Sequence, residues 1–165
     1  MKTLITITGP ENSGKTTLMW TVYEKLVAAN NIPHTIWVAG NCHELTTPHS
    51  RVYKPSGELW DFKAIINIDG VKLYIASAGD AIKYIEKSIE DAISFNASIV
   101  FTAIRTRTRS AIIQTEEYYN TEIKPKYSPI EFVSRRYIDS KSISEQNDQL
   151  SDEIVSAILK EVQKK

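Results

Sequence analysis

The sequence predicts an α/β protein of three layers, in which helices cover both faces of a mostly parallel sheet that carries one antiparallel strand. Three observations predict this class. Strand-like and helix-like segments alternate, a glycine-containing loop joins the first strand to the first helix, and Asp69-Gly70 separates two strand-like runs. The chain has 165 residues, and we expect residues 1–165 to form a single domain with one core.

The first part of the chain contains two strand-like segments and one helix. β-Branched and apolar residues predict a strand over 2–8, and apolar residues at helical spacing predict a helix over 15–30, which Pro33 terminates. A second strand is expected over 34–39. The segment 40–58 is polar and rich in turn residues, and a loop of this length is typical of a functional lid or of a passive excursion.

A hairpin and several helix-strand segments complete the prediction. Asp69-Gly70 joins apolar runs over 62–68 and 71–76, a strong signal for an antiparallel pair. The same periodicities predict a helix over 81–95, a strand over 97–103, a helix over 110–120, a loop bracketed by Pro125 and Pro129, a strand over 130–134 and a C-terminal amphipathic helix striped by Leu150, Ile154, Ile158 and Val162.

Residues 9–16 read Gly-Pro-Glu-Asn-Ser-Gly-Lys-Thr and fit the phosphate-binding pattern G-x-x-x-x-G-K-[ST] at every fixed position. The glycines let successive backbone amides point into one concavity, where they bind phosphate. Lys15 can reach the β- and γ-phosphates of a nucleotide, and the Thr16 hydroxyl can bind Mg²⁺. The motif predicts that the nucleotide is bound by Gly9, Asn12, Ser13, Gly14, Lys15, Thr16 and Thr17.

This strand, loop and helix resemble the start of P-loop nucleoside-triphosphate-binding proteins. The resemblance implies the three-layer P-loop NTPase fold and a nucleoside triphosphate with Mg²⁺ as ligands. A second stretch, 65–80, is similar to the hairpin and switch of Ras-like small GTPases, in which the strand ends in Asp-x-Ala-Gly-Gln. That resemblance implies that Gly79 contacts the γ-phosphate. Asp80 stands where that family has its water-orienting Gln, and Ala76 where it has its metal-binding Asp.

Asp80 is the first candidate for an acidic group beside the phosphates, because phosphoryl transfer needs charge neutralisation and positioning. We expect Asp80 to bind Mg²⁺ with Thr16 or to accept a proton from the nucleophile. The alternative is that Asp80 caps the helix that follows it. A further carboxylate, Asp61 at a strand start, either faces a substrate or merely ends the preceding loop.

Arginines follow the strand over 97–103, where GTPases carry the guanine-specificity sequence Asn-Lys-x-Asp. Because that sequence is absent, ATP is favoured over GTP. We expect Arg105 and Arg107 to act on transferring phosphate at the carboxyl edge of the sheet. By fold-level analogy, Arg135 would contact the nucleotide. The alternative for the arginines that follow the strand over 97–103 is a solvated basic turn that pairs with nearby acids.

Composition narrows the function classes. Twenty basic and twenty acidic residues cancel, which argues against nonspecific nucleic-acid binding. The sequence shows no signal peptide and no bilayer-spanning apolar run, and the lone Cys42 suits the reducing cytoplasm. We therefore expect a cytoplasmic, Mg²⁺-dependent ATP-binding enzyme, either a phosphotransferase like small nucleotide or nucleoside kinases, with a small-molecule acceptor, or an ATP hydrolase. The alternative is a GTPase-like molecular switch that acts through a protein partner.

Overall fold

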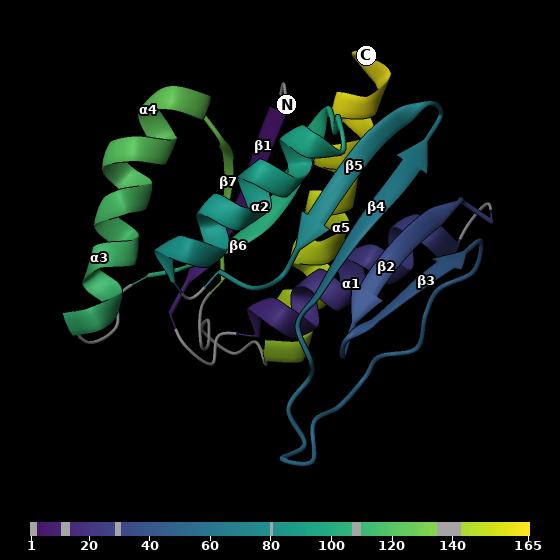
Figure 1. The fold of residues 1–165 in the computed structure, drawn as a ribbon, viewed down its shortest axis with the longest axis horizontal. Coiled ribbons are helices and arrows are strands. Elements are labelled where there is room, and N and C mark those ends of the chain that lie inside the picture. Colours follow the sequence, from purple (N-terminus) through teal and green to yellow (C-terminus); the bar gives the residue numbers. More distant parts are fainter. Residues whose placement is uncertain (1–2, 11–13, 29–30, 80, 107–109, 135–142) are drawn as a thin grey trace.

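One mixed sheet forms the centre of the structure, and helices lie on both of its faces (Figure 1). The computed structural model describes residues 3–10, 14–28, 31–79, 81–106, 110–134 and 143–165. Within them the strands are β1 (Thr3–Gly9), β2 (His34–Val38), β3 (Asn41–Leu45), β4 (Phe62–Ile68), β5 (Val71–Ala76), β6 (Ile99–Arg105) and β7 (Ile130–Val133). The helices are α1 (Lys15–Ala28), α2 (Ile82–Ser94), α3 (Ser110–Tyr118), the π-helical η1 (Tyr119–Ile123), α4 (Lys124–Tyr127) and α5 (Ile143–Gln163).

The sheet order is β3-β2-β4-β5-β6-β1-β7, and the last four strands in this order run parallel to one another. Their carboxyl ends therefore meet at one edge of the sheet. This is the edge at which open α/β sheets bind ligands. Because β6 separates β5 from β1, the end of the hairpin strand lies about 10 Å from the end of β1, two interstrand spacings away.

The other half of the sheet is antiparallel, so the predicted P-loop NTPase sheet, mostly parallel with one antiparallel strand, is wrong. β4 pairs antiparallel with both β2 and β5, and β2 pairs antiparallel with β3. Within the described residues, half of the strand pairings are thus antiparallel.

The prediction failed first in the segment 40–58, which was expected to be a loop but contains β3. This strand reads Asn-Cys-His-Glu-Leu, and its residues are exposed or half-buried, so it has no apolar alternation. Ala39 and Gly40, with φ of 50° and 78°, form the tight turn that folds β3 back onto β2. A second antiparallel pair therefore arises where hydrophobic patterning gives no signal.

Turn residues in the sequence led to one correct prediction and one error. The hairpin is confirmed: Asp69 and Gly70, with φ of 50° and 82°, join β4 to β5. The predicted loop between Pro125 and Pro129 is wrong in part, because Pro125 lies in the first turn of α4. Because α3, η1 and α4 follow one another without a break, this proline stands inside a helical stretch, which hydrophobic and turn patterns did not indicate.

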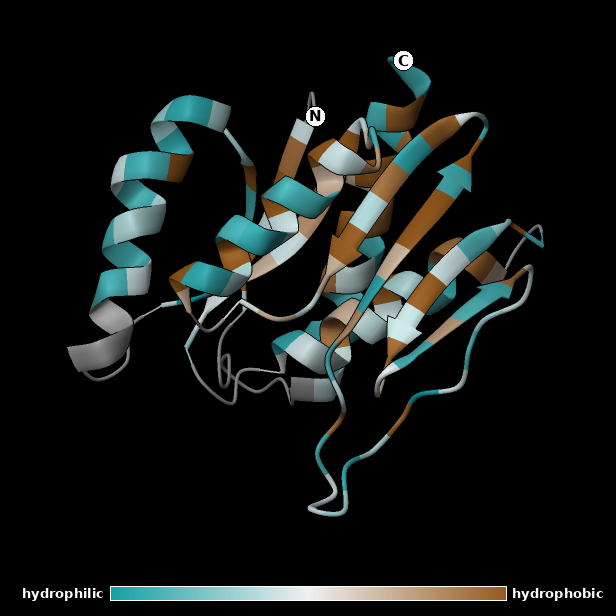
Figure 2. Cartoon of the chain, viewed as in Figure 1, coloured by the Kyte–Doolittle hydropathy of each residue, from teal (hydrophilic) through white to brown (hydrophobic). Residues whose placement is uncertain are grey.

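Hydrophobic side chains pack on both faces of the sheet. Ile5 and Ile7 of β1 belong to the cluster that includes residues of α1 and α5, whereas Leu4 belongs to the cluster that includes residues of α2 and η1. This alternation follows the two-residue period of a strand. Figure 2 shows hydrophobic residues along the central strands. In the described part of the chain, no helix combines the length and apolar character that crossing a bilayer requires.

Asp91 joins α2 to the antiparallel half of the sheet. Its carboxylate accepts hydrogen bonds from Lys63 at 3.3 Å and from Tyr74 at 3.2 Å, and it pairs with Lys87 at 2.9 Å. Burial raises the pKa of this carboxyl, but the bonds from Lys87 and Lys63 outweigh burial and lower the pKa below its ordinary value of 3.8.

Asp91→Asn is expected to lower the free energy of unfolding at neutral pH by about 1.5–3 kcal/mol, the contribution of a hydrogen bond to a charged group. Because the folded-state pKa is depressed, the wild-type carboxylate stabilises the fold above pH 3.8 and loses this effect as the pH falls through the folded-state value. Urea unfolding of both proteins between pH 3 and 7 would measure the difference. A difference that stays constant with pH would contradict the ionic role of Asp91.

Candidate functional site

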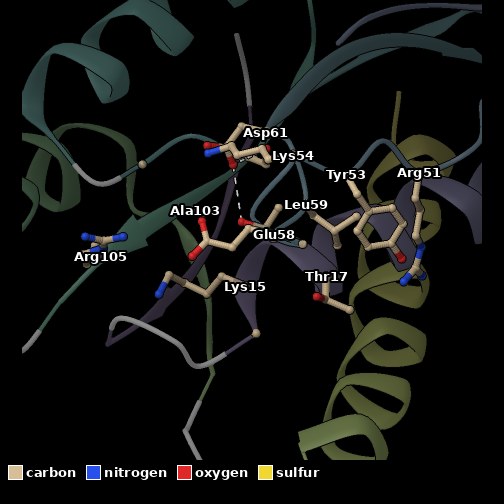
Figure 3. A pocket seen from close by; sticks show the side chains of 15 residues that line it. Lys15, Thr17, Arg51, Tyr53, Lys54, Glu58, Leu59, Asp61, Ala103 and Arg105 are labelled. Carbon is tan, nitrogen blue, oxygen red and sulfur yellow. Dashed lines mark hydrogen bonds between the residues drawn. The ribbon is translucent and has the colours of Figure 1, made fainter. Parts of the chain in front are cut away.

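A cavity of about 580 Å³ opens at the carboxyl edge of the parallel strands (Figure 3). Its walls come from the start of α1, the chain just after β5, the end of β6 and the segment that precedes β4. The described residues that line it are Gly14, Lys15, Thr16, Thr17, Arg51, Tyr53, Lys54, Gly57, Glu58, Leu59, Asp61, Ser77, Gly79, Ala103 and Arg105. The volume lies within the range of about 300–1,000 Å³ that is typical of small-molecule sites.

Lys15 is the first residue of α1, and its side chain folds back toward the end of β1. The ammonium Nζ donates hydrogen bonds to the carbonyl oxygens of Gly9 at 2.9 Å and of Pro10 at 2.5 Å. A carbonyl oxygen carries only a partial charge, so a phosphate oxygen is a stronger acceptor for the same ammonium. Lys15 is thus held at the cavity in a position from which it can exchange carbonyl partners for an anion.

The start of α1 is anchored to the C-terminal helix. Gly14 has φ of 82° and accepts the hydrogen bond of the Leu18 amide at 2.9 Å, which begins the helix. The Asn147 side-chain amide of α5 donates to the same Gly14 carbonyl at 3.1 Å. The backbone N–H groups of the first turn have no acceptor within a helix, and together with the helix dipole they favour an anion at this end.

Asp61 places a carboxylate beside the Thr16 hydroxyl. Thr16 Oγ1 donates to Asp61 Oδ1 at 3.4 Å, and Ser77 Oγ donates to the same oxygen at 2.9 Å. Hydroxyl and carboxylate oxygens are ligands that Mg²⁺ accepts in nucleotide sites, where it keeps several waters and binds few protein groups. The donor set of this pair therefore fits Mg²⁺.

Hydrogen bonds on both sides of Asp61 fix its position. The Trp60 carbonyl accepts a hydrogen bond from the indole Nε1 of Trp20, a fully buried residue of α1, at 3.0 Å. On the other side, the Phe62 amide donates to Ser77 Oγ at 2.8 Å, and the Ser77 amide donates to the Phe62 carbonyl at 3.0 Å. Asp61 is thus held between α1 and the end of β5.

Gly79 lies where the chain leaves β5 and passes close to β6. A Cβ atom at this position would lie 1.6 Å from the Ala103 carbonyl oxygen, and the Gly79 carbonyl accepts the Arg105 amide at 3.0 Å. This close approach requires glycine, independently of any contact with phosphate. It also brings Arg105 to the same cavity.

Gly79→Ala is expected to destabilise the protein by about 3 kcal/mol or more, at the upper end of overpacking costs, because the clash is with backbone rather than with a movable side chain. The matched control is Gly57→Ala, where a Cβ meets nothing within 4 Å and only the positive φ of 89° opposes the change. Urea unfolding of the two variants would compare them. Equal losses of stability would show that β6 leaves room at Gly79.

The structure brings several predicted residues together and leaves others untested. Lys15, Thr16, Thr17, Gly14, Gly79 and Arg105 line one cavity. Gly9 ends β1 and accepts a hydrogen bond from Lys15. Predicted site residues that lie outside the described residues are Asn12, Ser13, Asp80, Arg107 and Arg135.

The sequence did not show whether the segment before β4 contributes residues to the site. Residues 52–60 form a small hairpin, in which Tyr53 bridges to Leu59 and the Lys54 amide donates to the Glu58 carbonyl at 2.7 Å. Figure 1 shows this stretch extending beyond the ends of the strands. The unusual length of segment 40–58 was the signal that could have indicated it.

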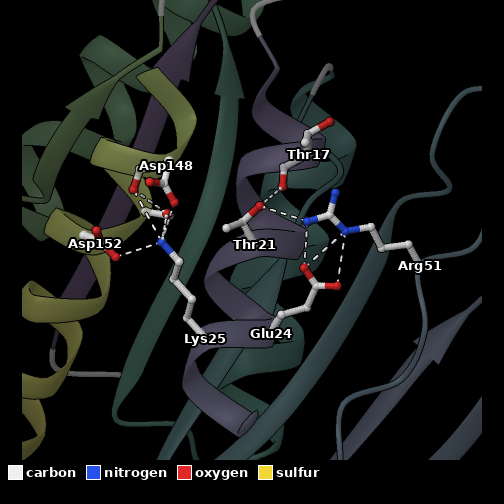
Figure 4. A network of polar contacts seen from close by, with 8 residues as sticks. Thr17, Thr21, Glu24, Lys25, Arg51, Asp148 and Asp152 are labelled. Carbon is white, nitrogen blue, oxygen red and sulfur yellow. Dashed lines mark hydrogen bonds and ion pairs between the residues drawn. The ribbon is translucent and has the colours of Figure 1, made fainter. Parts of the chain in front are cut away.

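Arg51 fastens the base of this hairpin to α1 (Figure 4). Its guanidinium donates to the Glu24 carboxylate at 2.7–3.1 Å and to Thr21 Oγ1 at 3.0 Å. Hydrogen bonding to Glu24 raises the pKa of the guanidinium, so the pair stays ionised at neutral pH. Elsewhere on α1, Lys25 pairs with Asp148 and Asp152, which lie on α5.

Comparison of the chain with protein-family models, with curated proteins and with solved structures finds no match. The chemistry of the cavity consequently stands on its own residues. Its central feature is the Lys15 ammonium in one cavity with the Thr16 hydroxyl and the Asp61 carboxylate, at the start of a helix.

Proposed function

We propose that the protein binds a nucleoside triphosphate with Mg²⁺ in this cavity and moves its γ-phosphate to an acceptor. The observation that carries the proposal is the contact of Thr16 with Asp61, 3.4 Å long, beside Lys15 in a cavity at the start of α1. The contiguous sequence from Gly9 to Thr16, with its phosphate-binding pattern, supports the same ligand.

Each of these groups has a role in transfer of a phosphoryl group. Lys15 exchanges its carbonyl partners for oxygens of the β- and γ-phosphates. Thr16 and Asp61 hold the metal ion, and the Ser77 hydroxyl orients the carboxylate. When bound, Mg²⁺ neutralises charge on the β- and γ-phosphate oxygens. Arg105 contacts the equatorial oxygens of the transferring group, where guanidinium stabilises developing charge.

The favoured nucleotide is ATP, because the guanine-specificity sequence is absent after β6. The favoured activity is a small phosphotransferase, since the cavity is lined both by Lys15 and by residues of the hairpin at 52–60, which have no assigned contact with the triphosphate. Hydrolysis corresponds to water in place of a second substrate. A molecular switch would bind the same nucleotide but would leave an acceptor unlabelled.

Ligand-dependent stability tests this proposal. We expect ATP with Mg²⁺ to raise the free energy of unfolding by about 2.7 kcal/mol at a hundred times its dissociation constant. GTP at the same concentration should raise it less. Omission of Mg²⁺ should reduce the effect of ATP. If no nucleoside triphosphate stabilises the protein, the proposal is wrong. ATP labelled at the γ-phosphate then separates an enzyme that labels a small molecule from one that releases free phosphate.

A further inference from the structure

The outer half of the cavity is built by the hairpin at 52–60 and carries an exposed aromatic ring. Tyr53 lines the cavity, and yet 58% of its surface is exposed to solvent. Aromatic rings contribute most to binding when a partner covers them. Figure 3 shows the Tyr53 ring beside Leu59, on the same side of the cavity as Thr17.

This ring is held in place by the backbone around it. Tyr53 forms a β-bridge with Leu59, and the Trp60 amide donates to the Val52 carbonyl at 2.8 Å. Arg51, immediately before the hairpin, is fixed to Glu24 of α1. A ring on so anchored a hairpin can accept a stacked ligand at a smaller cost in conformational entropy than a ring on a free loop.

The charges around the cavity favour an anion there. Among its described lining residues, Lys15, Lys54 and Arg105 are basic and Glu58 and Asp61 are acidic, while the charge of Arg51 is balanced by Glu24. In the proposed function Lys15 and Asp61 serve the triphosphate and its metal ion. Lys54, whose Nζ lies 5.2 Å from the centre of the Trp60 ring, remains on the hairpin for a second ligand.

We propose that this outer half binds the phosphoryl acceptor, and that the acceptor is a planar ring compound bearing an anionic group. The ring stacks on Tyr53, and the anionic group pairs with Lys54. The inference rests on the proposed function, because the acceptor receives the γ-phosphate. The shared chemistry, a flat ring and an anion, belongs both to nucleoside monophosphates and to aromatic carboxylates.

The transfer step balances without a further reactant. An ionised oxygen of the acceptor forms a bond to the γ-phosphorus, and the bond from that phosphorus to the bridging oxygen breaks. ADP leaves with the electron pair, and no proton moves because the attacking oxygen is already charged. Two anions must approach one another in this step, and the cations Lys54 and Arg105 reduce their repulsion.

Calorimetric titration tests the acceptor site in protein saturated with Mg²⁺ and a nonhydrolysable ATP analogue. The probes are the nucleoside 5′-monophosphates, the matching nucleosides without phosphate, ribose 5-phosphate without a base, and aromatic carboxylates. We expect ligands that combine ring and anion to bind at least tenfold more tightly than nucleosides or ribose 5-phosphate. Stronger binding by monophosphates or by carboxylates identifies the source of the anion. Absence of binding by every probe would overturn the inference.

Variants of the hairpin assign the binding to its residues. Tyr53→Ala should weaken the bound ring ligand by about 5- to 150-fold, the range of base–aromatic stacking, whereas Tyr53→Phe should keep most of the affinity. Lys54→Gln should weaken anionic probes and leave nucleosides unchanged. Tyr84→Ala, at an exposed tyrosine of α2, is the matched control and should change nothing. Wild-type affinity in both Tyr53→Ala and Lys54→Gln would overturn the inference.

Failure of this inference is distinguishable from failure of the proposed function. Stabilisation by ATP and Mg²⁺ should persist in Tyr53→Ala and Lys54→Gln, because neither residue holds the triphosphate. If the wild-type protein responds to ATP but binds no ring anion, only the acceptor assignment falls. If it binds ring anions through Tyr53 but no nucleoside triphosphate, the transfer function falls and with it the acceptor role of this site.

Discussion

Replacement of Lys15 by alanine is expected to abolish most of the stabilisation that we expect ATP with Mg²⁺ to give the folded protein. A hydrogen bond to a charged group contributes about 1.5–3 kcal/mol, and loss of one or two such bonds to phosphate would cancel a ligand increment of about 2.7 kcal/mol. Thermal or urea unfolding across an ATP titration measures the increment. The free energy of unfolding of each variant with ATP must be compared with that of the same variant without ligand, because Lys15 also donates to the Gly9 and Pro10 carbonyls.

The control for this variant is Lys25→Ala on the same helix. Lys25 pairs with Asp148 and Asp152 of α5 at 3.1 and 2.7 Å and does not line the cavity. Its removal should lower stability modestly, as partly exposed ion pairs do, and should preserve the full increment from ATP. An ATP increment in Lys15→Ala equal to that of the wild type would place the triphosphate elsewhere.

Asp61→Asn is expected to lower turnover by at least about 100-fold at low Mg²⁺ concentration, since metal ions supply several kcal/mol of charge stabilisation in the transition state. Asparagine has nearly the same shape and can still accept the hydrogen bond that Ser77 Oγ donates at 2.9 Å, so the fold should persist. The loss is therefore expected in metal affinity. Release of ADP measured as a function of Mg²⁺ concentration would show the curve shifted to higher concentrations.

Asp91→Asn provides the matched control, because it removes a carboxylate of α2 that does not line the cavity. This variant should lose stability but keep the wild-type dependence on Mg²⁺. If Asp61→Asn also keeps that dependence, Asp61 does not serve the metal. The predicted role would then return to Asp80, which lies outside the described residues.

Local patterns predicted most helices and strands and the antiparallel hairpin of β4 and β5, whereas the antiparallel pairing of β2 with β3 and β4 escaped prediction. The turn at Asp69-Gly70 identified its hairpin because two residues with positive φ suffice to reverse the chain. β3 was missed because it is short and polar and lies at the edge of the sheet, where neither face is buried. Without β3 the antiparallel half of the sheet was underestimated, since pairing direction depends on contacts between distant segments.

The residues of the candidate site also fall into those that local sequence predicted and those that only tertiary contacts place. Lys15 and Thr16 could be predicted because phosphate binding there needs contiguous residues, so that the spacing of the motif encodes the geometry. Asp61 could be named but not placed. Its position beside Thr16 depends on the antiparallel register in which Lys63 pairs with Ala76.

The sequence by itself determined the α/β class, the central hairpin and the residues that line the start of α1, because each depends on interactions within a few residues. Only the tertiary structure decided the mixed sheet, the carboxylate beside Thr16 and the hairpin that carries Tyr53. These features depend on hydrogen bonds across the chain, such as the bond from Trp20 to the Trp60 carbonyl, 40 positions apart. Such bonds form where packing brings a donor and an acceptor together, and the spacing of residues along the sequence does not predict these contacts.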